Sequence, residues 1–183
     1  LSMGKEHLYV WEMDENMVHE NEAAERLYKI CANENIYPSK EVKEGKIEAF
    51  ASVDGYFQID VDRLDEINSI GDIMIATRHS GTAVKAGDKL AGMRVIPLIV
   101  EDEKLKEAEK IFNGQPILKV TPYKLKKAGV ITTGSEVYKG IIKDTFTPVI
   151  EEKLSGFGIQ MTEHIVVDDG MENIVNAINE IKT

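Results

Sequence analysis

The chain has 183 residues, of which 43% are hydrophobic and 30% charged, enough apolar sequence to bury a core in one or two water-soluble domains. Its formal net charge of −10 repels nucleic acid and anionic lipid, so we expect no nucleic-acid and no membrane partner. The single cysteine, Cys31, excludes an internal disulfide and favours a reducing compartment. The start of the chain lacks the basic and apolar segments of a signal peptide, and we expect a cytoplasmic location.

The first 45 residues predict one strand and one helix. Residues 7–13 are rich in β-formers and predict the strand. A helix is predicted from Glu20, with His19 as a capping or solvated residue at its start. The apolar positions that repeat at helical spacing are Ala23 or Ala24, Leu27, Ile30 and Cys31.

Residues 46–100 predict a small, mostly β unit. Strands are expected at 46–53 and 56–61, joined by a hairpin turn at the Asp54-Gly55 dipeptide. A short helix is expected at 62–70, closed by Gly71.

The second half of this β unit contains three further predicted strands. Residues 73–77 form a compact apolar run, and residues 84–91 predict a strand, a Gly-Asp turn and a second strand. Residues 93–100 predict a long strand in which Pro97 indicates an edge or a bulge.

A charged amphipathic helix is predicted at 101–112, followed by a short strand at 117–120. The basic stretch around Pro122 predicts a solvated linker. We therefore expect two domains, residues 1–121 and 122–183.

From Ala128 onward the pattern changes to alternating strands and helices. Strands are predicted at 129–132 and 159–167, each followed by a turn, and Asp144 is a good N-cap for the helix between them. This order implies a right-handed crossover between two parallel strands. The apolar positions of the two predicted helices are Phe146, Val149, Ile150, Leu154 and Phe157 in the first and Met171, Ile174, Val175, Ile178 and Ile181 in the second.

The same C-terminal stretch resembles the molybdopterin-binding module shared by molybdenum-cofactor biosynthesis proteins and competence-damage-inducible proteins. That module opens with a strand and a Thr-Gly-(Asp/Ser/Asn)-Glu turn, continues through a glycine, a hydrophobic residue and an aspartate to a helix, and ends its second strand in an Asp-Asp pair. The matching positions are Thr133, Gly134, Ser135, Glu136, Gly140, Ile142, Asp144, Asp168 and Asp169. Ser135 stands where several family members carry aspartate, so one carboxylate is missing.

The resemblance covers residues 129–183 and implies an α/β fold: a truncated three-layer molybdopterin-binding module with parallel strands, preceded by a small mostly β domain. The family's next strand, its Gly-Gly-x-Gly loop and a further aspartate would follow Thr183, so we expect this chain to bind molybdopterin poorly or not at all. The N-terminal part resembles the region that precedes the module in some bacterial molybdopterin-binding proteins, on Asp54–Val61, Ile75–His79, Val84–Ala91 and Arg94–Leu98.

The resemblance also implies site residues, cofactors and partners. Molybdopterin is the expected ligand, with Mg²⁺ as a possible second cofactor, a homo-oligomer as a possible assembly, and no protein-held metal site. The expected catalytic residues are Asp144 and Asp168, and the expected cofactor-binding residues are Thr133, Gly134, Ser135, Glu136, Gly140 and Asp169.

Sheet geometry supports a site in this region, because ligands of open parallel sheets collect beyond the carboxyl ends of the strands. The loops after the two late strands should lie side by side there, and backbone amides with a helix N-terminus could hold a phosphate in an acidic protein. Each residue also has a plainer interpretation: Gly134 as a turn residue, Asp144 as an N-cap, Glu136 as a solvated acid, and Asp168 with Asp169 as turn residues.

Three functions follow as hypotheses. The first is molybdopterin binding in molybdenum-cofactor biosynthesis, with adenylylation or metal insertion as the reaction if there is one. The second is a non-catalytic ligand-binding or regulatory module, favoured by Ser135 and by the weak chemistry of the N-terminal region. The third is a metal-dependent pyrophosphate hydrolase of the competence-damage-inducible type. Arg78-His79 is most simply a surface pair, although Arg78 could clamp a phosphate or carboxylate.

Overall fold

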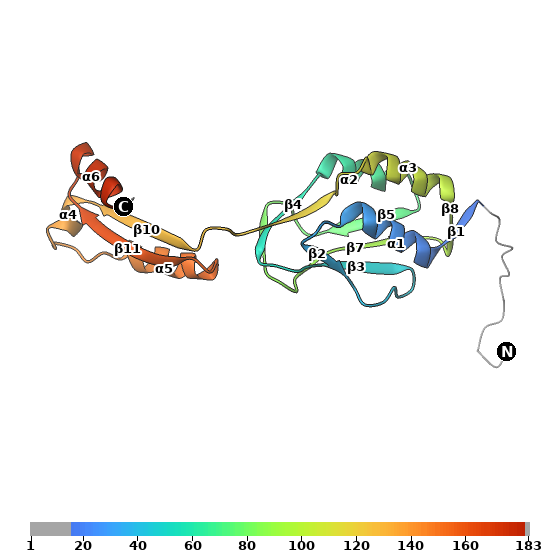
Figure 1. The fold of residues 1–183 in the computed structure, drawn as a ribbon, viewed down its shortest axis with the longest axis horizontal. Helices are drawn as coiled ribbons and strands as arrows, with labels where there is room; N and C mark the ends of the chain where they lie inside the picture. The colour runs from blue at the N-terminus through green and yellow to red at the C-terminus, as the bar shows by residue number, and fades with distance from the viewer. Residues whose placement is uncertain (1–15, 182–183) are drawn as a thin grey trace. The chain divides into compact units, whose positions relative to one another are not determined.

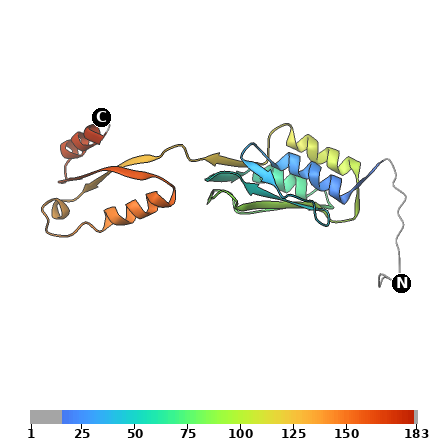
Figure 2. The ribbon, with the colours of Figure 1, turned by 60° about the horizontal axis from the view of Figure 1, so that its bottom comes forward.

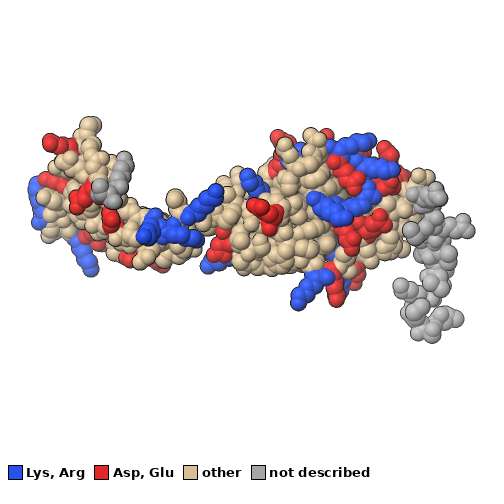
Figure 3. Space-filling view, in the orientation of Figure 1, with Lys and Arg blue, Asp and Glu red and all other residues tan. Residues whose placement is uncertain are grey.

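The computed structural model describes residues 16–181, so the strand predicted at 7–13 lies outside the described residues. The chain divides into two compact units, Leu1–Pro122 and Tyr123–Thr183, which are described separately (Figure 1). Lys and Arg side chains gather where the chain enters the second unit (Figure 3), at the exposed Lys124, Lys126 and Lys127. No helix within residues 16–181 combines the length and apolar character needed to cross a bilayer.

The N-terminal unit is a mixed α/β structure. Its strands are β1 (Met17–His19), β2 (Ile36–Pro38), β3 (Lys46–Ala51), β4 (Gly55–Ile59), β5 (Ile73–Thr77), β6 (Thr82–Val84), β7 (Lys89–Val95), β8 (Ile99–Glu101) and β9 (Leu118–Pro122). Its helices are α1 (Glu20–Cys31), α2 (Val61–Asn68) and α3 (Asp102–Phe112). The helices predicted to begin at Glu20 and to span 62–70 and 101–112 are thus confirmed.

The central sheet of this unit has the strand order β2-β3-β7-β5, all antiparallel. One face of it packs against the helices, α1 lying across β3 and β7 (Figure 2). This inner face supplies Ile47, Ala49, Ile75, Met93 and Val95 to the core, all at most 5% exposed. The β-rich segment therefore shares its core with helices from outside residues 46–100.

Two predicted hairpins are wrong. The strands on either side of Asp54-Gly55 do not pair, because β3 joins the central sheet while β4 pairs with β6 and β9. Likewise β6 and β7 flank the Gly87-Asp88 turn but belong to different sheets. Both turns exist, and the tertiary packing of the strands decides their partners.

The long strand predicted at 93–100 is also wrong. It is interrupted after Val95, and β8 begins at Ile99 and pairs with β1 instead of continuing the central sheet. Pro97 lies in the interruption, where it has no ladder hydrogen bond to donate.

Helix α1 confirms the predicted apolar face. Ala23, Ala24, Leu27 and Cys31 have no exposed surface. At its N-terminus the Nδ1 atom of His19 accepts a hydrogen bond from the amide of Asn21 at 3.3 Å, so His19 caps the helix. Burial raises the pKa of the Cys31 thiol to about 12, which leaves Cys31 as an apolar core residue.

The C-terminal unit is a two-stranded parallel sheet between helices, as the sequence predicts. Its elements are β10 (Lys127–Thr133), α4 (Ser135–Tyr138), α5 (Phe146–Gly156), β11 (Gln160–Val167) and α6 (Met171–Ile181). Strands β10 and β11 pair in parallel, with α5 against one face and α6 against the other (Figure 2). The three-layer arrangement and the parallel crossover are confirmed for the described residues.

Gly129 sets the distance between β10 and α6. A Cβ atom at this position would lie 2.3 Å from Cγ2 of Ile181, closer than packed atoms approach. The absence of a side chain at Gly129 therefore lets the last turn of α6 rest directly on the strand.

The predicted apolar faces of α5 and α6 are only partly buried. Phe146 on α5 is 74% exposed and Met171 on α6 is 83% exposed, whereas Ala177 is 3% exposed. In α6 the inward row is Ile174, Ala177 and Ile181, at helical spacing, and Val175 and Ile178 lie at its margin. The helices were predicted correctly, but the width of their buried faces was not.

Candidate functional site

The loops that follow β10 and β11 lie side by side at the carboxyl ends of the two strands. Thr133 and Val167 are paired at the last position of the ladder. The amide of Gly134 then donates to the carbonyl oxygen of Val167 at 3.3 Å. The two loops predicted to lie side by side therefore do so, at the carboxyl ends of one pair of strands.

Asp169 fastens these two loops together. One of its carboxylate oxygens, Oδ2, accepts hydrogen bonds from the Ser135 amide at 3.1 Å and from the Ser135 hydroxyl at 3.0 Å. Next to it, the Asp169 amide donates to Oδ1 of Asp168 at 2.9 Å. Serine at position 135 thus donates to a carboxylate that an aspartate there would repel.

A shallow cavity of about 200 Å³ opens beside this edge, on the face of the sheet that carries α6. Its walls combine the ring of Tyr138 with carboxylates and side-chain amides, among them those of Asp168, Asn173 and Asn176. Typical ligand pockets measure about 300–1,000 Å³, so a cavity of this size can hold part of a ligand. Its lining offers both donors and acceptors.

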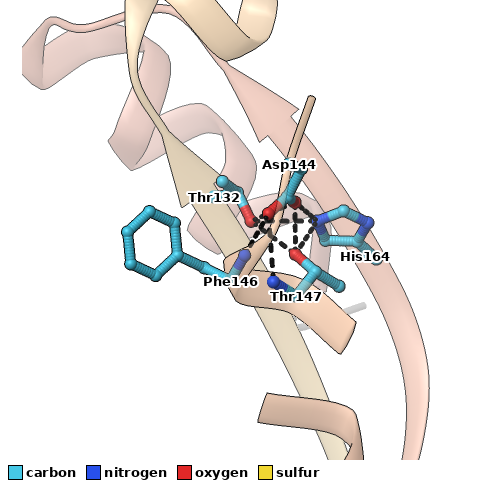
Figure 4. Close-up of polar contacts among 5 residues, drawn as sticks. All are labelled: Thr132, Asp144, Phe146, Thr147 and His164. Atoms are coloured by element: carbon cyan, nitrogen blue, oxygen red, sulfur yellow. Dashed lines mark hydrogen bonds and ion pairs between the residues drawn. The ribbon is translucent and has the colours of Figure 1, made fainter. Parts of the chain in front are cut away.

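Asp144 lies on the opposite face of the sheet, in a cluster of polar side chains at the start of α5 (Figure 4). Its Oδ1 atom accepts from the amides of Phe146 at 2.9 Å and Thr147 at 3.0 Å, which confirms the predicted capping role. Its Oδ2 atom accepts from the Thr147 hydroxyl at 2.5 Å and from the Thr132 hydroxyl at 3.3 Å.

His164 completes this cluster from the neighbouring strand (Figure 4). Its Nε2 atom lies 3.0 Å from the hydroxyl oxygens of both Thr132 and Thr147 and 3.6 Å from Oδ2 of Asp144. Because Thr147 already donates its single hydroxyl proton to Asp144, its oxygen can only accept from His164. The proton of a neutral His164 therefore sits on Nε2.

These bonds also lower the pKa of Asp144 below its usual value. The hydroxyl of Thr147 contributes most and the amide of Thr147 comes next, because both stabilise the charged carboxylate. Thr147 is 8% exposed, whereas the side chains of His164 and Asp144 are 28% and 16% exposed, so solvent reaches the cluster at His164 and Asp144.

The structure places the two aspartates that were predicted to be catalytic on opposite faces of the sheet. Asp168 borders the cavity on the α6 face, whereas Asp144 is engaged on the α5 face. The other predicted residues divide in the same way. Thr133 ends β10, Gly134 follows it, Ser135 begins α4, and Asp169 lies in the loop after β11, so these four lie where the two strands end. In contrast, Gly140 ends the turn after α4, and the exposed Glu136 accepts from the Ile141 amide through its carbonyl.

Several residues at these two places were missed from the sequence. His164 was not singled out, because its partners Thr132 and Thr147 come from a different strand and a helix. The position of Thr147, three residues after the capping Asp144, was the one available signal for this cluster. Tyr138, Asn173 and Asn176 gave no signal, since only the folded chain brings them to the cavity.

Within residues 16–181, no three His, Cys, Asp or Glu side chains are grouped to hold a metal ion between them. Mg²⁺ in phosphate chemistry is typically held by one or two carboxylates together with the substrate's phosphates. Asp168 fits that role better than Asp144, whose two oxygens are both occupied by hydrogen bonds from the start of α5.

Comparison with known proteins agrees with this geometry. Residues 129–183 match the family model of a probable molybdopterin binding domain. A CinA-like protein from Pseudothermotoga lettingae is 44% identical over 55 residues, which are 30% of this chain and 14% of the relative. The chain therefore spans a small part of that relative's length.

A solved structure, the molybdopterin biosynthesis moeA protein from Pyrococcus horikoshii OT3, is 14% identical to this chain. The alignment covers 90% of this chain and 64% of the moeA chain. Its TM-score of 0.27 is too low to carry an argument about the fold. The family match and the CinA-like relative both concern the C-terminal unit: residues 129–183 match the molybdopterin-binding, CinA-like domain family.

Proposed function

We propose that the C-terminal unit binds molybdopterin at the paired loops after β10 and β11, as part of molybdenum-cofactor biosynthesis. The observation that carries the proposal is the joining of these loops by Ser135 and Asp169 at the carboxyl edge of a parallel sheet. Such an edge is where ligands of open α/β sheets bind.

The chemistry of the adjoining cavity suits a pterin. A pterin ring has amino and ring N–H donors alongside carbonyl and ring-nitrogen acceptors. The Asp168 carboxylate can accept from its donors, and the side-chain amides of Asn173 and Asn176 can satisfy either kind of group. Helix α6 begins at Met171, beside this loop. The positive end of its dipole attracts a phosphate even though the chain as a whole is negatively charged.

Mg²⁺ would enter this site with the substrate's phosphate and be held by Asp168. When bound, it would neutralise charge on a transferred or cleaved phosphate. The chain's own contribution is to orient the ligand: Gly134 and Ser135 fix one loop, Asp169 ties it to the other, and Asp168 faces the ligand.

The test is an NMR titration of the 183-residue chain with molybdopterin, which detects weak binding. We expect shifts of the amide signals of Gly134, Ser135, Asp168 and Asp169. Asp168→Asn should weaken binding, whereas Glu152→Gln, an equal charge change on the exposed surface of α5, should not. Equal affinities for the two variants would count against the proposal.

A second function, binding without catalysis, is favoured by the state of Asp144. Its carboxylate caps α5 and bonds to Thr132 and Thr147, so it acts in folding and not at the cavity. An enzyme that uses Asp168 should lose turnover by orders of magnitude in Asp168→Asn, while a binding module should change only its affinity. Measuring phosphate or pyrophosphate release alongside binding separates the two.

A further inference from the structure

The outer face of the N-terminal sheet carries a groove that the proposed function does not use. The inner face of the sheet packs on the helices, and no helix among residues 16–122 covers the outer face (Figure 2). A cavity of about 460 Å³ lies here over β3, β5 and β7. That volume is within the range of about 300–1,000 Å³ typical of small-molecule sites.

Four cations line the groove: Lys46, Arg78, Lys89 and Arg94. Two carboxylates partly balance them. The Oε1 atom of Glu48 lies 2.7 Å from Nζ of Lys46 and 2.5 Å from Nζ of Lys89, so one carboxylate forms ion pairs with two lysines. Asp88 pairs with Arg78 at 3.0 Å. The groove keeps two unbalanced positive charges in a chain whose net charge is −10.

Arg94 holds one of these charges. Within the described residues no carboxylate pairs with it, and its Nε atom donates to the carbonyl oxygen of Val95 at 3.2 Å. It also stands directly opposite Lys46 in the β3–β7 ladder. Like charges at directly opposed positions of an antiparallel pair are destabilising. An arrangement that costs stability is typical of a functional site, where a bound anion would relieve the repulsion.

A β-bulge adds Lys89 to the same face. Along β7 the odd-numbered Ala91, Met93 and Val95 are buried, so Lys89 would point inward if the alternation continued. The register shifts between Ala49 and Phe50, which leaves Leu90 as the extra residue, and it is Leu90 that is buried while Lys89 is exposed. Bulges commonly redirect a side chain in this way at functional sites.

The floor of the groove is apolar and open. It is formed by Met74, which is 44% exposed, by Ala76, and by Gly92 in the middle of β7. Glycine inside a strand weakens it and often marks a place where a ligand approaches the backbone closely. Here Gly92 leaves a surface on which a flat apolar group can lie beneath the cations.

We propose that this groove binds a small organic phosphate, with the phosphate group at Arg94 and Lys46 and an apolar, planar portion over Met74, Ala76 and Gly92. Arginine and lysine are the usual partners of phosphate oxygens. A single strand-wide groove that ends in a cation pair fits one compact ligand better than an extended acidic chain. The site lies wholly within the N-terminal unit and is independent of the proposed function.

The experiment titrates the 183-residue chain with phenyl phosphate and, separately, with inorganic phosphate, following amide signals by NMR. We expect phenyl phosphate to shift signals of β5 and β7 and to bind more tightly than inorganic phosphate, because only the former covers the apolar floor. Arg94→Gln should weaken binding by roughly tenfold or more, as loss of a charge-assisted contact does.

Two further variants control the result. Lys110→Gln removes a charge from α3, on the helical side of the unit, and should leave the affinity unchanged. Gly92→Val places a side chain on the floor without changing charge and should abolish the preference for phenyl phosphate over inorganic phosphate. A Cβ at residue 92 would lie 3.2 Å from Cε of Lys46 and 4.0 Å from its next neighbours, the Ile47 carbonyl oxygen and Nζ of Lys46. Only the flexible end of Lys46 has to shift, so this variant should fold.

The proposal is overturned by either of two results. One is that phenyl phosphate causes no saturable shifts at β5 and β7, although the NMR spectrum shows that the chain is folded. The other is equal weakening in Arg94→Gln and Lys110→Gln, which would indicate screening of overall charge.

Discussion

Asp169 accepts two hydrogen bonds from Ser135 through a single oxygen, 3.1 Å from the amide nitrogen and 3.0 Å from the hydroxyl. This contact spans 34 residues of sequence and joins the ends of the two parallel strands. It fixes the two loops to each other at this end of the sheet.

Ser135→Asp should loosen this edge, because it replaces a donor with a second carboxylate beside Asp169. The protection of the residue 135 amide from hydrogen exchange, relative to an unstructured amide at the same pH, should fall at pH 7. Ser135→Ala, which keeps the hydrogen bond from the amide, should lose about 1 kcal/mol or less of local stability. Equal exchange rates in the two variants at pH 7 would contradict this account of Ser135.

Gly129→Ala should destabilise the C-terminal unit by about 1–3 kcal/mol, the usual cost of overpacking. The added Cβ would lie 2.3 Å from Cγ2 of Ile181, so α6 would have to move away from β10. Urea unfolding followed by circular dichroism measures the change. Combining it with Ile181→Ala should recover part of the loss, since the two side chains compete for one space. Additive losses in the double variant would show that the close approach is not the cause.

Asp144→Asn tests the charge on the cap of α5. Hydrogen bonds from Thr147 and Phe146 depress the pKa of Asp144, so its stabilising effect is present above the unfolded-state pKa of about 3.9 and is lost as pH falls through the lower folded-state pKa. The natural chain should therefore be more resistant to urea than Asp144→Asn at pH 6, and the difference should shrink as the pH falls below the unfolded-state value of about 3.9. A difference that grows toward low pH would contradict the depressed pKa.

Arg26 should contribute more to the N-terminal unit than the exposed ion pairs do. It donates to Glu109 at 2.7 Å and to Asp102 at 2.6 Å, and its side chain is 18% exposed. These bonds raise its pKa and link α1 to α3. Arg26→Met should cost about 1.5–3 kcal/mol in urea unfolding. Lys110→Met, whose pair with Glu103 spans 3.9 Å on the surface, should cost well under 1 kcal/mol. Similar losses would show that burial adds nothing to the Arg26 contacts.

The sequence predicted local structure well where periodicity was strong. The helix from Glu20 was found because Leu27 and Cys31 repeat on one face, and the parallel pair was found because a helix separates its two apolar runs. Asp144 was identified as a cap from its position alone.

Strand partners could not be predicted in the same way. Asp54-Gly55 turns the chain as expected, yet β4 pairs with β9, 59 to 67 residues further along. Both edges of β3 are already taken by β2 and β7, so a local hairpin has no free edge to use. The cluster around His164 was likewise missed. Its members are contributed by β10, α5 and β11, and no local pattern connects Thr132 to His164.

The central claim is that the paired loops after β10 and β11 form a molybdopterin site, and amide NMR of the 183-residue chain with added molybdopterin tests it most directly. The account predicts saturable shifts at Gly134, Ser135, Asp168 and Asp169, weakened in Asp168→Asn and unchanged in Glu152→Gln. Saturable shifts confined to β5 and β7, or no shifts at all at ligand concentrations that saturate weak sites, would contradict it.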